Sequence, residues 1–301
     1  MDTQVINASG TGNPSGTLNA NQFTRDGYYF AGWNTQPNGS GTSYGNGATY
    51  TASTTGDTTV TLYAQWFDGS TIQDLTKSTC QTLASSQSIQ VLDVRDGNLY
   101  NVRYINGNCW MTQNLRYVGD AGSSSTSMIM KSATSNIASD QTLTIGDLTS
   151  GNDYNNARIH VATSNQVPSG ATYTATDMGV WYNYAAASAG FVTSNQNAST
   201  ESTYSVCPAG WRLPTYSEQS GITSYMSQYF NADSQGNYTA VTGGYYSDGN
   251  VNSTGNGYWW SSTSYRSSSS LRYRLYYNGS SLNTGYNSRY YGFYVRCIRS
   301  T

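Results

Sequence analysis

Metal ligands and reactive side chains are scarce in this chain of 301 residues. It has one histidine, His160, and four cysteines, Cys80, Cys109, Cys207 and Cys297, with no C-x-x-C pair among them. A zinc site needs clustered Cys and His ligands, so none is expected. An even cysteine count favours two disulfides over four buried thiols, and pairing Cys207 with Cys297 would brace the carboxy-terminal sheet. Four cysteines allow three connectivities, between which these spacings do not choose.

Charge is also scarce. Asp, Glu, Lys and Arg make up 10% of the chain, against roughly 25% in a typical soluble domain. The 28 tyrosines and seven tryptophans supply enough aromatic mass for a core. No apolar run approaches the roughly 20 residues of a membrane span, and the first residues do not resemble a signal peptide. We expect an extracellular or cell-surface protein whose export signal was removed or lies outside this sequence.

Little in the sequence supports catalysis. His160 lies in a strand-like context, where a histidine with satisfied hydrogen bonds is more common than a general base. The carboxylates that could act in pairs are in turns, where Asp commonly caps the backbone; they are Asp93 with Asp96, Asp147 with Asp153, and Asp248. We predict that the protein is not an enzyme, has no catalytic residues and needs no metal ion or cofactor.

The stretch from Gly257 to Arg299 differs from the rest of the chain. It holds six of the twelve arginines, and no Asp or Glu follows Asp248. Tyrosines alternate there with Ser, Asn and Gly. Tyr, Ser, Gly, Asn and Arg are the residues of antibody-like binding surfaces, and a charge asymmetry of this kind marks a partner surface.

This stretch also has the pattern of strands. From Leu271 to Tyr277 every second residue is apolar or aromatic, which predicts a buried face opposite an exposed face with Arg272, Arg274, Tyr276 and Asn278. A second strand is predicted from Tyr291 to Ile298, with Phe293, Val295 and Cys297 buried. Asn278-Gly279 and Thr284-Gly285 predict the turns. Alternatively, Tyr, Ser and Asn simply suit a solvated sheet.

The first part of the chain reads as a small β-rich module. Its pattern is F-x-x-x-G-Y-x-F-x-G-W-N-T, then G-S-G-T-x-Y-x-x-G-A-x-Y, then T-L-Y-A-Q-W, between Phe23 and Trp66. This closely resembles the Listeria–Bacteroides repeat, also called the internalin B-repeat. The resemblance implies a small β-grasp-like domain that spaces or presents a neighbour on a bacterial surface. We place this domain at residues 1–67, with an altered opening strand before residue 20.

Further along, local signals predict a few elements. Residues Ile72 to Leu83 favour a helix, and Val91 to Ile105 a hairpin around Asp96-Gly97-Asn98. Tyr216 to Phe230 reads as a helix capped by Thr215 or Ser217, with Glu218 in its first turn. Between them, residues 119–200 are rich in Ser, Thr and Asn, and we expect insertion loops with short elements there.

Five motifs in order support a second resemblance, over residues 72–299: D-x-R-D-G-x-x-Y, N-C-W-M-T-Q-N-L, C-P-A-G-W-R-L-P-T, Y-W-W-S-S-T and G-F-Y-V-R-C-I-R. They look like the Fibrobacter succinogenes major paralogous domain. That family implies an α+β, C-type lectin-like domain, here 68–301, with an irregular antiparallel sheet, two helices and long loops. It also implies a disulfide between Cys207 and Cys297 and structural roles for Trp110, Trp211, Trp259 and Trp260.

The end of the chain is similar to the variable proteins of diversity-generating retroelements. In these systems adenine-directed mutagenesis rewrites a carboxy-terminal cassette, here 257–299. An AAY codon randomised at its adenines cannot give Lys, Glu, Gln, Met or Trp, and all five are missing from Tyr265 to Tyr291. Related proteins without a retroelement favour the same residues, so flanking DNA must decide.

Our interpretation is a cell-surface or secreted binding protein whose partner is a protein or glycan on another cell, a phage or a host surface. The expected ligand-binding residues are Tyr265, Arg266, Arg272, Arg274, Tyr276, Tyr286, Asn287, Arg289 and Tyr290. The alternatives are a structural or adhesive surface component, or a calcium-dependent glycan lectin, against which the carboxylate-poor tail argues. Nucleic acid is not expected, because the whole chain is acidic, with a pI near 5.2.

Overall fold

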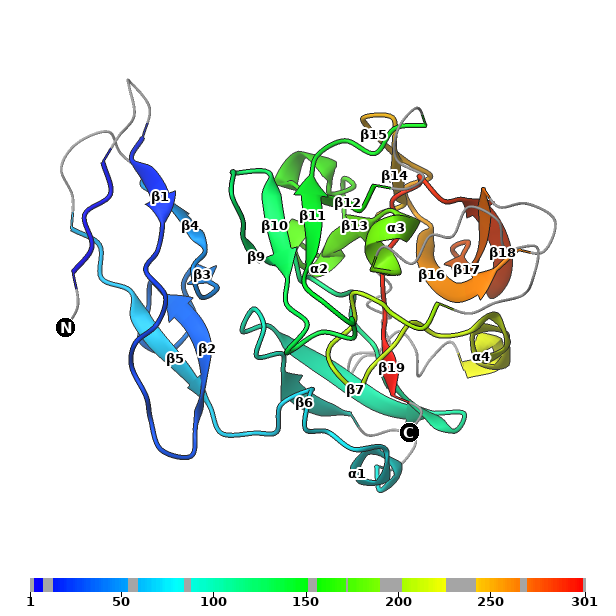
Figure 1. Ribbon diagram of the computed structural model, residues 1–301, viewed down its shortest axis with the longest axis horizontal. Coiled ribbons are helices and arrows are strands. Elements are labelled where there is room, and N and C mark those ends of the chain that lie inside the picture. Colours follow the sequence, from blue (N-terminus) through cyan, green and yellow to red (C-terminus); the bar gives the residue numbers. More distant parts are fainter. Residues whose placement is uncertain are drawn as a thin grey trace. The chain divides into compact units, whose positions relative to one another are not determined.

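The computed structural model describes residues 3–7, 13–53, 59–83, 88–150, 156–171, 173–189, 202–225, 242–265 and 270–299. It consists mostly of strands, with a few short helices and several small sheets (Figure 1). Two compact units are distinguished, Met1–Ile72 with Gln90–Leu99, and Gln73–Ile89 with Tyr100–Thr301. The division at residues 67 and 68 stays a prediction. No helix of the described residues is long and apolar enough to cross a bilayer.

The first unit contains two small antiparallel sheets. One pairs β1 (Ser15–Thr17) with β4 (Thr49–Thr51), and the other has the order β3 (Ser43–Tyr44), β2 (Tyr29–Asn34), β5 (Tyr63–Phe67). Phe30 packs edge-on against Trp33 and Trp66. The buried Asn34 accepts hydrogen bonds from the backbone N–H groups of Gln36 and Gly41, which fixes the loop after β2.

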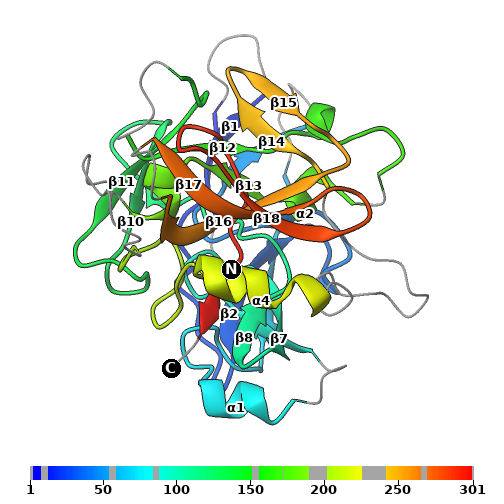
Figure 2. The same cartoon turned by 90° about the vertical axis from the view of Figure 1, so that its right-hand side faces the viewer.

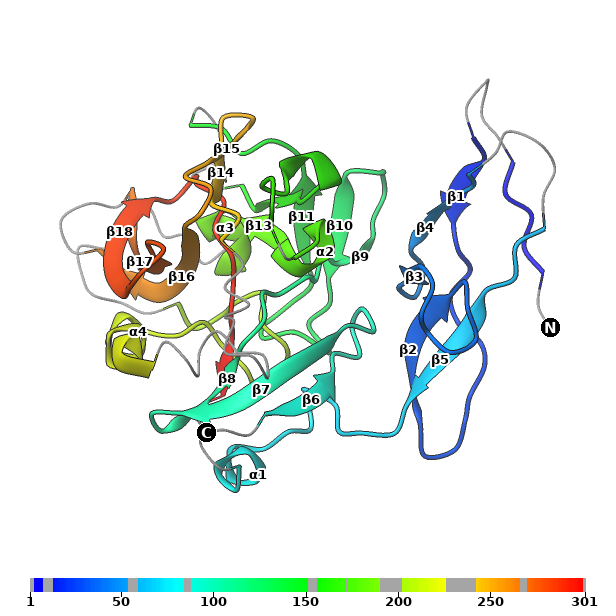
Figure 3. The same ribbon diagram turned by 180° about the vertical axis from the view of Figure 1, so that it is seen from behind.

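A four-stranded sheet includes the terminal strand of the described chain. Its order is β19 (Ile298–Arg299), β8 (Asn108–Met111), β7 (Leu99–Ile105), β6 (Ile89–Leu92). The predicted hairpin is therefore present, formed by β6 and β7. The helix expected from Ile72 to Leu83 is shorter, since α1 covers Lys77–Gln81, where Thr76 caps its first turn. Figure 3 shows α1 below β7.

A five-stranded sheet occupies much of the region that we expected to be insertion loops. Its order is β13 (Val180–Tyr182), β12 (Arg158–Val161), β11 (Gln141–Ile145), β10 (Ser127–Met130), β9 (Asp120–Ala121). Only β11 and β12 pair in parallel. The short helices α2 (Ala175–Met178) and α3 (Tyr184–Ala187) flank β13. Short strands with polar edges lack the long alternation that predicts a strand from sequence, which explains the difference.

Two carboxy-terminal arginines, Arg272 and Arg274, and several of the tyrosines lie on a three-stranded antiparallel sheet, which we call the tail sheet. It consists of β16 (Gly257–Ser264), β17 (Leu271–Tyr277) and β18 (Leu282–Ser288), in that order. The hairpin β14 (Tyr245–Ser247) and β15 (Asn250–Asn252) precedes it. Helix α4 packs against the tail sheet (Figure 2). The strand predicted at Leu271–Tyr277 is confirmed.

Helix α4 covers Tyr216–Gly221 and continues as a 3-10 turn, η2, at Thr223–Tyr225. The predicted cap is confirmed at Thr215, whose hydroxyl accepts from Glu218 N while the Glu218 carboxylate accepts from Thr215 N. Residues 226–230 of the predicted helix lie outside the described residues. A second 3-10 turn among the described residues, η1, covers Ser164–Gln166.

Both disulfides form, Cys207–Cys297 and Cys80–Cys109. The segment from Gly292 to Ile298 is buried throughout, not on alternate sides. It is extended but is not the regular strand that we predicted: it makes isolated bridges with β13, β14 and β16, and only Ile298–Arg299 joins a sheet. Because neighbouring elements cover it from several directions, every side chain is buried. It runs through the second unit towards β8 (Figure 1).

Candidate functional site

The register of the tail sheet decides which side chains share a face. Arg274 on β17 pairs with Trp260 on β16 and with Gly285 on β18, and Tyr276 pairs with Tyr258 and Asn283. These residues lie on one face of the sheet. Tyr273, Leu275 and Tyr277 lie on the opposite face, which packs against α4 and the core.

Arg272 and Arg289 do not stand outward, which corrects our prediction. Their exposed fractions are 3% and 5%. The guanidinium of Arg272 lies 4.8 Å from the centre of the Tyr184 ring, and its Nη1 donates to the carbonyl of Leu271 at 2.7 Å. The sequence suggested a solvated face here. Instead α3 and the segment around Phe293 cover the part of this face that carries Arg272, with Trp260 packed 4.3 Å from the Phe293 ring.

Arg274 is half-buried but keeps hydrogen-bonding capacity. Its guanidinium lies 4.2 Å from the Tyr276 ring centre and 5.1 Å from that of Tyr258, and its Nε donates to Asn287 Oδ1. Nη1 is buried without a hydrogen-bond partner. Among the described residues no carboxylate is within ion-pairing distance of Arg274. Burial lowers its pKa to about 10, so the side chain is charged at neutral pH.

Tyrosines gather on the other face, near the start of α4. Tyr265 stacks on Tyr286 at 4.0 Å between ring centres, Tyr273 lies 5.3 Å from Tyr265, and Tyr216 lies 4.2 Å from Tyr273. We call these four residues the α4-side tyrosine cluster. Tyr286 is 49% exposed and Tyr216 is 36% exposed. A hydrogen bond with Tyr265 raises the pKa of Tyr286. The cluster offers aromatic surface and hydroxyl groups to solvent.

Sequence reasoning missed two members of this cluster. Tyr273 was assigned to the buried face, but it is half-exposed beside α4. Tyr216 was read only as the first residue of a helix. No local signal marked Tyr216, because its contact with Tyr273 joins residues far apart in the chain.

Two predicted residues remain, Tyr290 and Arg266. Tyr290 packs edge-on against Tyr291 and its hydroxyl lies 3.5 Å from Asp248 Oδ2, whereas Arg266 lies outside the described residues. The structure therefore brings Arg274, Tyr276 and Asn287 together on one face, and Tyr265 and Tyr286 on the other. The surface consists of two patches and not one continuous array.

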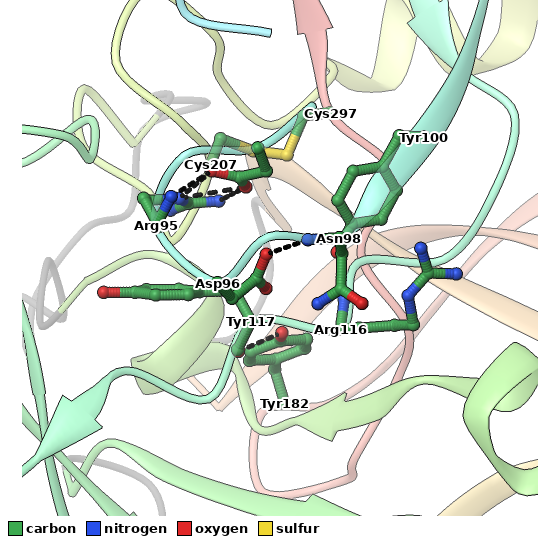
Figure 4. Close-up of polar contacts among 10 residues, drawn as sticks. Arg95, Asp96, Asn98, Tyr100, Arg116, Tyr117, Tyr182, Cys207 and Cys297 are labelled. Atoms are coloured by element: carbon green, nitrogen blue, oxygen red, sulfur yellow. Dashed lines mark hydrogen bonds and ion pairs between the residues drawn. A yellow bond between two sulfur atoms is a disulfide. The ribbon is translucent and has the colours of Figure 1, made fainter. Parts of the chain in front are cut away.

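Two of the carboxylates that could act in pairs, Asp93 and Asp96, cap turns as predicted. Asp93 accepts from Arg95 N at 3.1 Å and forms a buried ion pair with its guanidinium at 2.7 Å, and Asp96 accepts from Asn98 N at 2.9 Å (Figure 4). Asp248 accepts from Ser150 N at 3.1 Å. Asp153 lies outside the described residues.

His160 belongs to an aromatic stack. Its ring lies 3.7 Å from that of Tyr246, and Gln166 is within 3.0 Å of its Nε2. Asp147 accepts from the Tyr246 hydroxyl. Burial lowers the pKa of His160, so it is neutral at neutral pH. No group of three potential metal ligands occurs among the described residues. The absence of enzymatic activity stays a prediction.

Small antiparallel sheets, short helices and two disulfides define a mostly β protein. Residues 5–65 match the Listeria-Bacteroides repeat domain. The match begins before Phe23, so the opening residues that looked altered belong to the repeat. No curated protein and no solved structure matches the chain. The repeat indicates a bacterial surface protein, and the repeat and disulfides together indicate an extracellular or cell-surface setting.

Proposed function

We propose that this chain is a ligand-binding protein of a bacterial surface, in which the repeat presents a C-type lectin-like domain and the tail sheet binds the ligand. The single observation that supports it most is the α4-side tyrosine cluster. Rigid, stacked and partly exposed tyrosines make contact area at low entropic cost. We assign no enzymatic activity, and a protein or glycan on another cell, a phage or a host surface is the proposed partner.

The test measures binding of the fluorescently labelled chain to a glycan array and to intact bacterial, phage and host-cell surfaces. The double variant Tyr265→Ala/Tyr286→Ala should lose about tenfold or more in affinity, since tyrosines dominate such surfaces. The matched control is Tyr29→Ala/Tyr63→Ala in the first unit, where both residues are similarly exposed. The control should bind like the wild type. Undiminished binding by the first variant would show that the tyrosine cluster is not the binding surface.

Arginine variants need care. Replacing Arg272, Arg274 and Arg289 together would remove two buried guanidinium groups and so confuse unfolding with loss of binding. Arg274→Gln alone is the suitable variant, because Arg274 is half-exposed.

Calcium dependence separates a glycan lectin from this proposal: binding that disappears with a chelator favours the lectin.

We also propose that the tail is a diversified cassette. The residues reachable from a mutagenised AAY codon make up almost all of Tyr265 to Tyr291, including Tyr265, Tyr286 and Tyr290. Flanking DNA provides the test. A reverse transcriptase gene beside a near-identical repeat that differs at adenines is expected, and intact flanks with neither feature would leave a fixed adhesive protein as the better interpretation.

A further inference from the structure

The outer edge of β18 has an open hydrogen-bonding side. β18 pairs with β17 from Leu282 to Ser288, and no strand of the described residues pairs with its other edge. Two hydrogen bonds show which opposed residues of β17 and β18 form hydrogen-bonded pairs. They run from Arg289 N to Ser270 O and from Asn278 N to Ser281 O. In an antiparallel pair, alternate residues direct both backbone groups to the partner. Asn283, Gly285 and Asn287 therefore face β17, and the N–H and C=O groups of Thr284 and Tyr286 point outward.

β18 also lacks the features that usually protect an edge strand. Its sequence, LNTGYNS, has no charged residue and no proline, and the register with β17 runs through seven pairs without a bulge. Charges, prolines and bulges are the common means of preventing strand addition. An edge of this length without them can accept a further strand.

Arg274 places a positive charge beside this edge. It lies across from Gly285, and a Cβ on Gly285 would be 3.0 Å from its Nη1. The absence of a side chain at Gly285 therefore lets the guanidinium extend over β18. Residues opposite each other on adjacent strands have Cβ atoms about 4.5–5.5 Å apart. If another strand paired with β18, its residue opposite Gly285 would have its side chain on the same face as Arg274. That side chain would reach Arg274 Nη1, which is buried without a hydrogen-bond partner.

We propose that the outer edge of β18 binds an extended peptide segment of a partner protein as a fourth strand, with an acidic side chain opposite Gly285 that pairs with Arg274. This rests on the proposed function, because it names the partner of the same sheet. Backbone bonds to Thr284 and Tyr286 would supply affinity and the carboxylate specificity. A second copy of this chain fits less well, since β18 has no carboxylate and two Arg274 side chains would approach each other.

The experiment uses two fluorescein-labelled peptides, Thr-Val-Thr-Glu-Thr-Val-Thr and the same sequence with Gln in place of Glu, in anisotropy titrations of the full chain. We expect the Glu peptide to bind about tenfold more tightly. Arg274→Gln should remove this preference. Thr284→Pro removes an outward-pointing N–H without removing a hydrogen bond to β17 and should abolish binding of both peptides, whereas the matched control Thr284→Val keeps that N–H and should bind normally.

Should Thr284→Pro fail to fold, Gly285→Ala replaces it. The new methyl group displaces the guanidinium and should reduce the Glu preference while backbone binding remains. Equal binding of the two peptides, no binding of either up to about 1 mM, or a concentration-dependent dimer abolished by Thr284→Pro would overturn the proposal. If neither peptide binds while Tyr265→Ala/Tyr286→Ala still lowers ligand binding, this inference fails and the proposed function stands.

Discussion

Asn114 shows how one side chain holds the end of the chain in place. Its Oδ1 accepts from Trp259 Nε1 at 2.8 Å and from Arg296 Nε at 3.1 Å, and its Nδ2 donates to the Met178 carbonyl at 3.0 Å. All of these groups are buried. An amide suits this position because it accepts and donates at once. Arg296 therefore has a structural role in this buried network.

Two aspartates should give the stability of the protein opposite responses to pH. Burial, and then the neighbouring Asp93, raises the pKa of Asp96 to about 6. A carboxyl with a raised folded-state pKa contributes stability below its unfolded value near 4, and this is lost as the pH rises through about 6. Asp96→Asn should be more stable than the wild type near pH 7, because the amide carries no charge that burial penalises. We expect a gain on the order of 2 kcal/mol, which allows for the part of the residue that remains in water.

The advantage of Asp96→Asn should vanish below about pH 4. Asp140 is the control of opposite sign: hydrogen bonds from Ser132 N and then Lys131 hold its pKa at about 2. Its stabilisation is present above the unfolded value and lost as the pH falls towards 2, so Asp140→Asn should be less stable at neutral pH. Urea denaturation at several pH values measures both. A pH-independent difference for Asp96→Asn would contradict the prediction.

At the scale of elements, helix α4 depends on its cap. The Thr215 hydroxyl accepts from Glu218 N at 3.1 Å, and the helix carries Tyr216 against Tyr273 of the tail sheet. Thr215→Ala should cost about 1 kcal/mol in the free energy of unfolding. Ser217→Ala is the control, since Ser217 is exposed in the first turn, and should change stability by less than about 0.5 kcal/mol. Chemical denaturation compares the two, and equal effects would mean that the cap contributes little.

Elements with strong local chemistry could be predicted from the sequence, and others could not. The Thr215 cap, the Asp96-Gly97-Asn98 turn and the alternation of β17 depend on neighbours in the chain. By contrast, the five-stranded sheet depends on pairings such as that of β11 with β12, which local patterns do not encode. The strands of the five-stranded sheet were therefore not predicted from the sequence.

At the scale of the whole molecule, the two disulfides close loops of different length. The sequence separations are 90 residues for Cys207–Cys297 and 29 for Cys80–Cys109. Loop-closure entropy then predicts stabilisation of about 4.6 and about 3.6 kcal/mol, respectively. Cys207→Ala/Cys297→Ala should thus lower the free energy of unfolding by about 1 kcal/mol more than Cys80→Ala/Cys109→Ala. Denaturant titrations of the two variants measure this, and the reverse order would contradict it.

The candidate site was only partly predictable for a related reason. Composition drew attention to the tail, where Tyr286 is exposed and Arg274 has a buried Nη1 without a hydrogen-bond partner. It could not separate them from Arg272 and Arg289, because what buries these two comes from distant parts of the chain, such as Tyr184. Burial of an outward-facing strand residue is decided by tertiary packing, which one strand's alternation does not record.

The buried course of residues 292–298 affects how the protein is made. During synthesis, Cys207 and the strands around Trp181 and Trp259 are made before the segment that fills the space between them. The second unit must wait, with an unpaired thiol, for Cys297 to emerge. The long loop between the two cysteines can therefore close only after the strands of the tail sheet have been made.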